Sequence, residues 1–365
     1  MRYTTFGRDT GLRVSEYALG TGNFGTRARS DGPGSDLLWG RRGPGADRDG
    51  SRTVFERFAE AGGTFIDTAD CYQFGESEEL VGEFIAADRD HFVLATKFTN
   101  GASPQPHVSG TGNSRKNMVR SVEASLRRLG TDYIDLYWAH FPDTVTPVEE
   151  ILAAFDDLVR AGKILYAGLS NFPAWRVSRA AAIAEARGWA PVTGIQSEYS
   201  LAQRTPDREL LPMADSLGLG AALWSPLGGG LLTGLYRRGT DGWTSEGKRV
   251  IRGGDADQRE AILDEVLAVA KETGEPPARI AVAWVRARAR RAGTGFVPVI
   301  GPRNAAQLAD YLEALDITLT EEQVARLDAV SAVPLGAPHE VNALALDPVL
   351  GGAGGRVERP ATPAA

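Results

Sequence analysis

Cysteine is almost absent from this sequence: Cys71 is the only one in 365 residues. A single cysteine cannot form an internal disulfide, so the fold depends on a hydrophobic core and suits a reducing compartment. Histidine is also scarce, with four in the chain, and none of them has the spacing of a zinc site. We therefore expect no bound metal.

Long apolar runs and an excess of basic charge are missing too. No stretch reaches the roughly 18 apolar residues that cross a bilayer, and the N-terminal MRYTTFGRDTGLRVS lacks the features of a secretory signal. The net charge is −7, and the basic residues of Arg286–Arg291 fall on a predicted solvated helix face. These absences predict a soluble, cytoplasmic protein without a nucleic-acid or membrane partner. They carry no signal for the oligomeric state.

What the sequence does contain is a regular alternation of short β-rich runs and longer amphipathic runs, which predicts βαβ units around a parallel sheet. The predicted strands are Tyr17–Gly20, Thr64–Asp67, Phe92–Lys97, Tyr133–Trp138, Ile164–Leu169, Thr193–Gln196, Ala221–Trp224 and Phe296–Ile300. The predicted helices are Ser51–Ala61, Ser77–Ala86, Lys116–Leu129, Val148–Ala161, Ala174–Arg187, Arg208–Leu217, Ala278–Arg290 and Asn304–Ala314. Eight such units, with no GxGxxG after the first strand, favour an α/β fold of the (β/α)8 TIM-barrel type over a doubly wound sheet.

Several segments lie outside this eightfold count. A predicted N-terminal hairpin, Thr4–Phe6 with Leu12–Val14, would close the barrel floor. Helices over 258–271 and 321–330 are extra, and the Gly-rich segments 25–50, 99–113 and 228–255 predict long loops at the C-terminal face. We expect segment 228–255 to close over a bound ligand. Residues 1–335 are predicted to form one domain, and 336–365 a largely disordered tail.

Four polar residues follow or close predicted strands, where barrel enzymes keep their chemistry. Asp67 and Lys97 close the second and third strands, Tyr72 follows five residues after Asp67, and His140 follows the fourth strand. Each alone has an ordinary explanation: a loop cap, a structural ion pair, an amphipathic loop residue, a satisfied polar side chain. Cys71 is expected only to pack, because no histidine is near it in sequence.

Together the four residues suit the reduction of a carbonyl group. Hydride transfer to a carbonyl needs a proton donor for the developing alkoxide, and a tyrosine with a pKa around 10 is a weak acid at neutral pH. A nearby ammonium should lower the pKa of Tyr72, and Asp67 should keep Lys97 charged and oriented. His140 can hydrogen-bond the substrate oxygen.

These residues lie in stretches that resemble the aldo-keto reductase family. FIDTADCYQFGESEELVG is similar to the family's signature, and ATKF, YIDLYWAH, GLSNF, IQSEYS, WSPLGGGLLTG and VIGPRNAAQL follow in the family's order over roughly residues 12–335. The stretches YWAH…TPVEE and AGKILYAGLSNF look like the bacterial aryl-alcohol and sugar-ketone reductase branch of the family rather than the aldose reductase branch. The resemblance implies that Tyr72 is the general acid, that Lys97 and Asp67 tune it, and that His140 orients the carbonyl.

The resemblance also implies NADPH as the cofactor and a set of binding residues for it. The set consists of Gly22 and Asn23 at the nicotinamide ribose; Ser170, Asn171 and Gln196 at the carboxamide; Trp224 stacked on the ring; Ser225, Leu227, Gly228 and Gly230 at the pyrophosphate; and Gly301, Arg303 and Gln307 at the adenosine phosphate. Tyr311 departs from the family pattern, in which many members have an asparagine that contacts adenine.

The sequence therefore predicts NADPH-dependent reduction of a ketone or aldehyde as small-molecule substrate. A keto-sugar nucleotide or another natural-product ketone is the first expectation. An aromatic aldehyde is the second, in a pocket lined by Phe24, Trp39, Phe141 and Trp243. Two alternatives remain open: a regulatory barrel that binds the nicotinamide cofactor but turns it over slowly, and a Schiff-base lyase that uses Lys97 as nucleophile.

Overall fold

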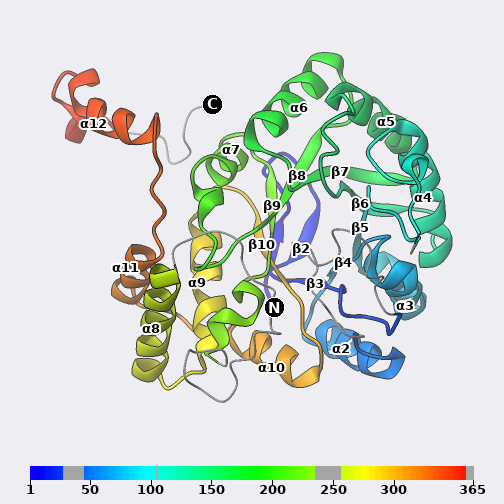
Figure 1. The fold of residues 1–365 in the computed structure, drawn as a ribbon, viewed down its shortest axis with the longest axis horizontal. Helices are drawn as coiled ribbons and strands as arrows, with labels where there is room; N and C mark the ends of the chain where they lie inside the picture. Colours follow the sequence, from blue (N-terminus) through cyan, green and yellow to red (C-terminus); the bar gives the residue numbers. More distant parts are fainter. Residues whose placement is uncertain (28–44, 104, 235–255, 359–365) are drawn as a thin grey trace.

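A computed structural model describes residues 1–27, 45–103, 105–234 and 256–358. Its centre is a closed barrel of eight parallel strands that follow one another in chain order, with the last strand pairing with the first (Figure 1). The barrel strands are β3 (Ala18–Gly20), β4 (Phe65–Asp67), β5 (Val93–Phe98), β6 (Ile134–Ala139), β7 (Ile164–Ser170), β8 (Val192–Glu198), β9 (Gly220–Trp224) and β10 (Phe296–Ile300). The predicted (β/α)8 fold is confirmed.

A ring of helices surrounds the barrel (Figure 1). The ring consists of α2 (Arg48–Glu60), α3 (Glu76–Ile85), α4 (Arg115–Leu129), α5 (Val148–Arg160), α6 (Ala174–Arg187), α7 (Leu210–Ser216), α9 (Pro277–Arg291) and α10 (Ala305–Glu313). The predicted extra helices are present as α8 (Ala256–Thr273) and α11 (Glu321–Val330). Within the described ranges, no helix combines the length and apolar character that a membrane crossing requires.

Helix α5 shows how the sequence pattern produces this ring. Its apolar residues recur at three- and four-residue spacing, so that Ile151, Leu152 and Phe155 are all buried on one face. The helix ends at Arg160, and two residues later Gly162 has a φ of 70°, a left-handed conformation that glycine adopts without a side-chain clash. Because the barrel supplies an apolar outer wall, this face packs directly onto the strands.

The predicted hairpin is formed by β1 (Tyr3–Thr5) and β2 (Arg13–Ser15), and it closes the barrel floor. The ring of Phe6 is fully buried inside the barrel, 5.5 Å from the ring of Phe65 and 6.1 Å from that of Trp138. Gly194 leaves room for it: a Cβ at that position would lie 2.5 Å from the Phe6 ring. The floor is therefore a packed apolar plug.

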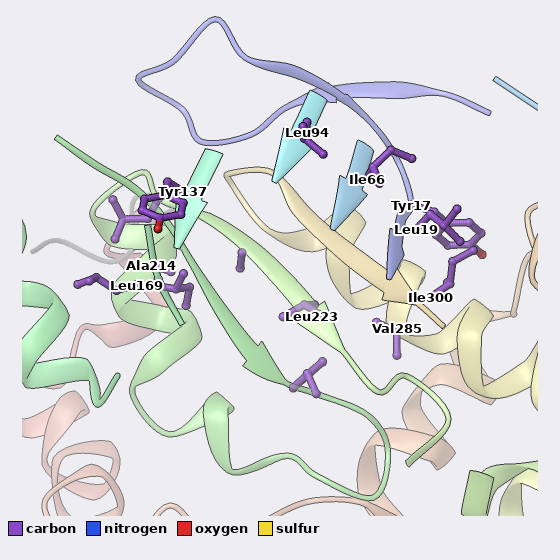
Figure 2. Close-up of a cluster of buried hydrophobic side chains, with 14 of the residues drawn as sticks. Tyr17, Leu19, Ile66, Leu94, Tyr137, Leu169, Ala214, Leu223, Val285 and Ile300 are labelled. Atoms are coloured by element: carbon purple, nitrogen blue, oxygen red, sulfur yellow. The ribbon is translucent and has the colours of Figure 1, made fainter. Parts of the chain in front are cut away.

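The larger apolar core lies outside the barrel, between strands and helices. Figure 2 shows Leu19, Ile66 and Leu94 on neighbouring strands, with Val285 of α9 in the same cluster. These side chains are fully buried. Inward positions of the same strands are thereby left for the plug at one end of the barrel and for polar residues at the other.

The structure describes only parts of two predicted long loops and of the predicted C-terminal tail. Residues 28–44 and 235–255, the larger parts of two predicted long loops, lie outside the described residues. The second of these ranges is most of the segment 228–255 that is expected to close over a ligand. In the predicted tail the structure has a helix, α12 (His339–Val349), which Figure 1 shows away from the barrel. A helix there departs from the expected largely disordered tail, while the domain division at residue 335 stays a prediction.

Removal of the plug should destabilise the protein without altering the barrel mouth. We expect Phe6→Ala to lower the free energy of unfolding by about 3–5 kcal/mol, because a buried ring is replaced by a cavity. The urea midpoint measures this change. Arg13→Ala, on the exposed face of the same hairpin, is the matched control and should shift stability by no more than about 0.5 kcal/mol. Equal midpoints for the two variants would show that the plug contributes little.

Candidate active site

The second and third barrel strands place a buried ion pair at the C-terminal mouth of the barrel. The ammonium of Lys97 is fully buried and donates hydrogen bonds to Oδ2 of Asp67 at 2.6 Å, to the carbonyl oxygen of Thr68 at 2.7 Å and to Oη of Tyr72 at 3.2 Å. Three acceptors match the three N–H groups of an ammonium. The structure thus brings three of the four predicted catalytic residues into one chain of contacts.

Tyr72 lies on a short, strained loop rather than on a regular element. It begins the 3-10 turn Tyr72–Gly75, in which Gln73 and Phe74 have φ values of 50° and 55°. Such left-handed conformations cost free energy for residues with a side chain and persist where the surroundings hold them. The Tyr72 side chain remains partly exposed. Its hydroxyl therefore sits between the buried Lys97 and the open mouth.

Burial and charge act in opposite directions on this pair. Burial disfavours the ammonium of Lys97, but the Asp67 carboxylate and the Tyr72 hydroxyl outweigh it, so the pKa of Lys97 is raised. The pKa of Tyr72 is raised above 10.0, chiefly by burial; Lys97 acts to lower it, and the Asp67 charge acts to raise it. The expected net lowering of the Tyr72 pKa is therefore wrong, because the sequence pattern does not reveal desolvation. Tyr72 is held protonated, as a donor must be.

His140 completes the predicted set from the end of β6. Its backbone N–H contacts the carbonyl oxygen of Phe98 at 3.1 Å and Oγ1 of Thr99 at 3.2 Å. The His140 ring lies edge-on to Tyr72, with centroids 6.1 Å apart, and Phe141 stacks on it at 4.5 Å. A carbonyl oxygen between the two rings could be approached by both.

Cys71 lies closer to this centre than the sequence indicated. Its Sγ is 3.9 Å from Nδ1 of His140 and 3.9 Å from Nδ2 of Asn100. The interpretation of Cys71 as a packing residue relied on the absence of a nearby histidine in the sequence. Cys71 and His140 are 69 residues apart in the sequence, but the barrel brings the ends of β4 and β6, which precede them, to one face.

The residues predicted to bind a nicotinamide carboxamide are linked to the catalytic set. Nε2 of Gln196 donates to Oδ1 of Asp67 at 2.9 Å, and Nδ2 of Asn171 donates to the carbonyl oxygen of His140 at 3.0 Å and to Oγ of Ser170 at 3.0 Å. Amide and hydroxyl groups of this kind can both donate to and accept from a carboxamide. Their present bonds orient them at the mouth.

Trp224 and the turn after it form the next part of the predicted cofactor site. Trp224 is half-buried at the end of β9, and the residue that follows, Ser225, has a φ of 59°. The turn then folds on itself: the N–H of Gly228 donates to the carbonyl oxygen of Ser225 at 2.8 Å, and that of Gly230 to Leu227 at 3.0 Å. A pyrophosphate would share these N–H groups with the turn.

The predicted adenosine end lies where β10 meets the first strand. Nδ2 of Asn23 donates to the carbonyl oxygen of Gly301 at 2.9 Å, and the half-buried Gly22 precedes it. The N–H of Arg303 donates to Oε1 of Gln307 at 2.9 Å, which leaves the exposed Arg303 side chain at the surface.

Tyr311 turns inward from this end. Burial raises its pKa, and its hydroxyl is hydrogen-bonded by the backbone of Gly301. An adenine contact from this residue would require the side chain to leave the core.

This donor set fits a dinucleotide. It runs from amide and hydroxyl groups at Gln196 and Ser170, past an aromatic face at Trp224, to an exposed guanidinium at Arg303. Among the described residues, no group of three or more His, Cys, Asp or Glu side chains is arranged to hold a metal ion.

The residues expected to line the substrate pocket divide into three cases. Phe141 is half-exposed beside His140, as a pocket wall requires. Phe24 is fully buried against Phe84 of α3 and belongs to the core, because the chain turns back there to pair with Ala46. Trp39 and Trp243 lie outside the described residues.

Two acidic residues near the site were missed by sequence reasoning. Glu198 is half-buried at the end of β8, paired in register with Trp224, and burial raises its pKa to about 7. The two-residue spacing from Gln196 could have placed it at the mouth. Asp70 lies two residues before Tyr72 and is buried. Its position between Asp67 and Tyr72 in the motif IDTADCY could have identified it from the sequence.

The comparisons with known proteins agree with this geometry. The sequence model described as "Aldo/keto reductase family" matches residues 34–332. The norsolorinic acid reductase of Aspergillus flavus is 37% identical over 335 residues, 90% of this chain and 80% of that protein. An uncharacterized oxidoreductase of Bacillus subtilis is 37% identical over 94% of this chain and 100% of its own length. A Saccharomyces cerevisiae protein named among the aryl-alcohol dehydrogenases is 33% identical over 93% and 89%. The chain belongs to the aldo/keto reductase family and is an NAD(P)H-dependent oxidoreductase.

Proposed function

We propose that this protein reduces a ketone or aldehyde with NADPH and that Tyr72 is the general acid. The observation that carries the proposal is the Lys97 ammonium, which bonds both the Asp67 carboxylate and the Tyr72 hydroxyl in a buried position. Bound beside Trp224, a reduced nicotinamide would supply a hydride to the carbonyl carbon. The proton for the carbonyl oxygen comes from the protein.

Tyr72 gives its proton to the substrate oxygen as negative charge develops there. The phenolate that remains lies 3.2 Å from the Lys97 ammonium, which stabilises it at the moment of transfer. The proton is regained from solvent through the open mouth. His140 holds the carbonyl oxygen in place by a hydrogen bond from its ring, and the rigid strand end that carries it fixes the approach.

The same contacts disfavour the Schiff-base alternative. A nucleophilic lysine must be neutral and reach the substrate, whereas Lys97 is fully buried, charged and bonded to three acceptors. A regulatory barrel with slow turnover is the remaining alternative. Steady consumption of NADPH with a panel of carbonyl compounds separates it from an enzyme.

We propose a substrate whose carbonyl is attached to an aromatic or extended apolar framework, such as a natural-product ketone. Phe141 supports this class because its ring is half-exposed beside the catalytic His140. The names of the norsolorinic acid and aryl-alcohol relatives point the same way. A panel of aryl ketones, aryl aldehydes and keto-sugar nucleotides tests it, and a preference for the keto-sugars would support the other natural-product class expected from the sequence.

Tyr72→Phe removes the proton donor and keeps the ring. We expect kcat to fall by about 10²–10⁴-fold, the usual contribution of a general acid, while NADPH binding is kept. Absorbance loss of NADPH measures turnover, and quenching of Trp fluorescence measures binding. Tyr166→Phe, a half-buried tyrosine on β7, is the control. Near-native turnover in Tyr72→Phe would refute the assignment.

Lys97→Met should act on both activity and stability. Loss of the ammonium leaves the phenolate unsupported and Asp67 buried without its cation, so we expect at least about 10²-fold lower kcat and about 3–5 kcal/mol lower unfolding free energy. Lys163→Met, at a partly exposed lysine paired with Glu123, should leave both nearly unchanged. A Lys97→Met protein of native stability would mean that the ion pair does not hold the site.

Arg303 should set the choice between NADPH and NADH. Its guanidinium is exposed at the start of α10 and offers a rigid fork of donors that suits a 2′-phosphate. We expect Arg303→Ala to weaken NADPH binding by about tenfold, roughly 1.4 kcal/mol, with little change for NADH. Titration with both cofactors decides the point, since equal losses would place the 2′-phosphate elsewhere.

A further inference from the structure

Asp70 is a buried carboxyl group that the proposed mechanism does not use. It lies between Asp67 and Tyr72 in the loop that follows β4, and it is 2% exposed. Its backbone N–H donates to the carbonyl oxygen of Lys97 at 3.0 Å. This backbone bond fastens the loop that carries Asp70 to the end of β5.

One oxygen of Asp70 ties two loops together. The carboxyl accepts hydrogen bonds from the backbone N–H groups of Cys71 and Gly101. Cys71 directly precedes Tyr72, and Gly101 follows Thr99, whose Oγ1 contacts the backbone N–H of His140. A single side chain therefore connects the segment that carries the proton donor to the segment that holds the substrate-orienting histidine.

Both of these loops contain residues in unfavourable conformations. Thr99 has a φ of 113°, and Gln73 and Phe74 on the Tyr72 loop also have positive φ values. Such conformations persist where hydrogen bonds fix the backbone. The two N–H groups that bond Asp70 lie two residues from strained positions: Cys71 precedes Gln73 on one loop, and Gly101 follows Thr99 on the other.

The other oxygen, Oδ1, is buried without a hydrogen-bond partner. The groups that face Asp70 are Glu78 of α3, Arg128 of α4 and Tyr137 of β6. Arg128 is already committed to Glu78, which its Nη2 contacts at 2.6 Å. Glu78 is fully buried and also accepts from Thr96. Arg128, the cation among these described groups, is therefore already paired with a carboxylate and does not neutralise a second one.

We propose that Asp70 is a positioning residue for the reduction and that it works as a neutral carboxylic acid, fastening the Tyr72 loop to the loop that holds His140. This inference rests on the proposed function of the site. Ionisation of Asp70 would place a second negative charge beside Glu78 and loosen the loop that carries Tyr72. A small displacement of the donor is enough to reduce the rate strongly.

Burial and the nearby Glu78 raise the pKa of Asp70 to about 8, against the opposing effects of Arg128 and the two N–H groups. The ordinary value is 3.8, so an unfolded chain ionises this group well before the folded one. Folding stability is therefore lost progressively as the pH rises from about 4 to about 8, and the loss is complete above that range. Burial raises the pKa of the Tyr72 hydroxyl as well, against the opposing effect of Lys97.

Asp70→Asn tests the charge state without using the reaction. The carboxamide keeps the acceptor oxygen and cannot ionise, so its melting temperature should rise relative to wild type as the pH goes from about 5 to about 8. Asp156→Asn is the matched control, because Asp156 is a buried carboxylate already paired with Arg160. The difference in melting temperature between Asp156→Asn and wild type should not change over the same pH range. A pH-independent difference for Asp70→Asn as well would overturn the proposal.

The kinetic test separates positioning from stability. Wild-type and Asp156→Asn kcat should fall about tenfold at pH 9, one unit above the Asp70 pKa, whereas Asp70→Asn should keep its rate there. Asp70→Leu, which removes both acceptor bonds, should lose about 10²-fold in kcat with unchanged NADPH affinity. A high-pH limb retained in Asp70→Asn, or native kcat in Asp70→Leu, would overturn the role. If wild type reduces no carbonyl, the proposed function fails, and the melting series still reports on Asp70.

Discussion

The bond between Lys97 and Asp67 is the constraint on which the rest of the site depends. A buried ammonium is costly unless acceptors surround it, and here the carboxylate at 2.6 Å meets that requirement. Because Asp67 ends β4 and Lys97 lies near the end of β5, the parallel register of the barrel brings them together. Tyr72 and Gln196 are each hydrogen-bonded to a member of this pair, which fixes their side chains at the mouth. Removing either charge would therefore disturb the positions of both Tyr72 and Gln196.

The floor and the mouth of the barrel are built on different physics. At the floor, Phe6 packs against Phe65 and into the space left by Gly194, so stability there comes from apolar burial. At the mouth, inward positions carry charged and amide groups whose mutual bonds replace water. The strands connect the two ends rigidly, which lets a stable apolar base support a polar and strained catalytic edge.

Much of the fold and the clustering of the four candidate catalytic residues could be predicted from the sequence, because strand ends of a barrel converge by topology alone. Strand boundaries differ from the predicted ones by a residue or two: β5 runs to Phe98 and β6 to Ala139, since cross-strand pairing sets the ends. The sequence pattern could not predict how deeply each side chain is buried. The net pKa direction of Tyr72 and the inward turn of Phe24 both depend on desolvation and packing, which spacing does not reveal.

Long-range proximity was the other missing information. Cys71 and His140 are 69 residues apart in the sequence, yet Sγ of Cys71 lies 3.9 Å from Nδ1 of His140. The Asp70 carboxyl likewise accepts a hydrogen bond from the backbone of Gly101 on another loop. These contacts suggest why one scaffold serves relatives with different names. Tyr72, the Lys97 ammonium and the bonds behind them are fixed by strand ends and buried side chains. The residues that meet a substrate stand on loops, where Phe141 can be exchanged at little cost to the ion pair. Reaction type and substrate choice are thus carried by separate parts of the same mouth.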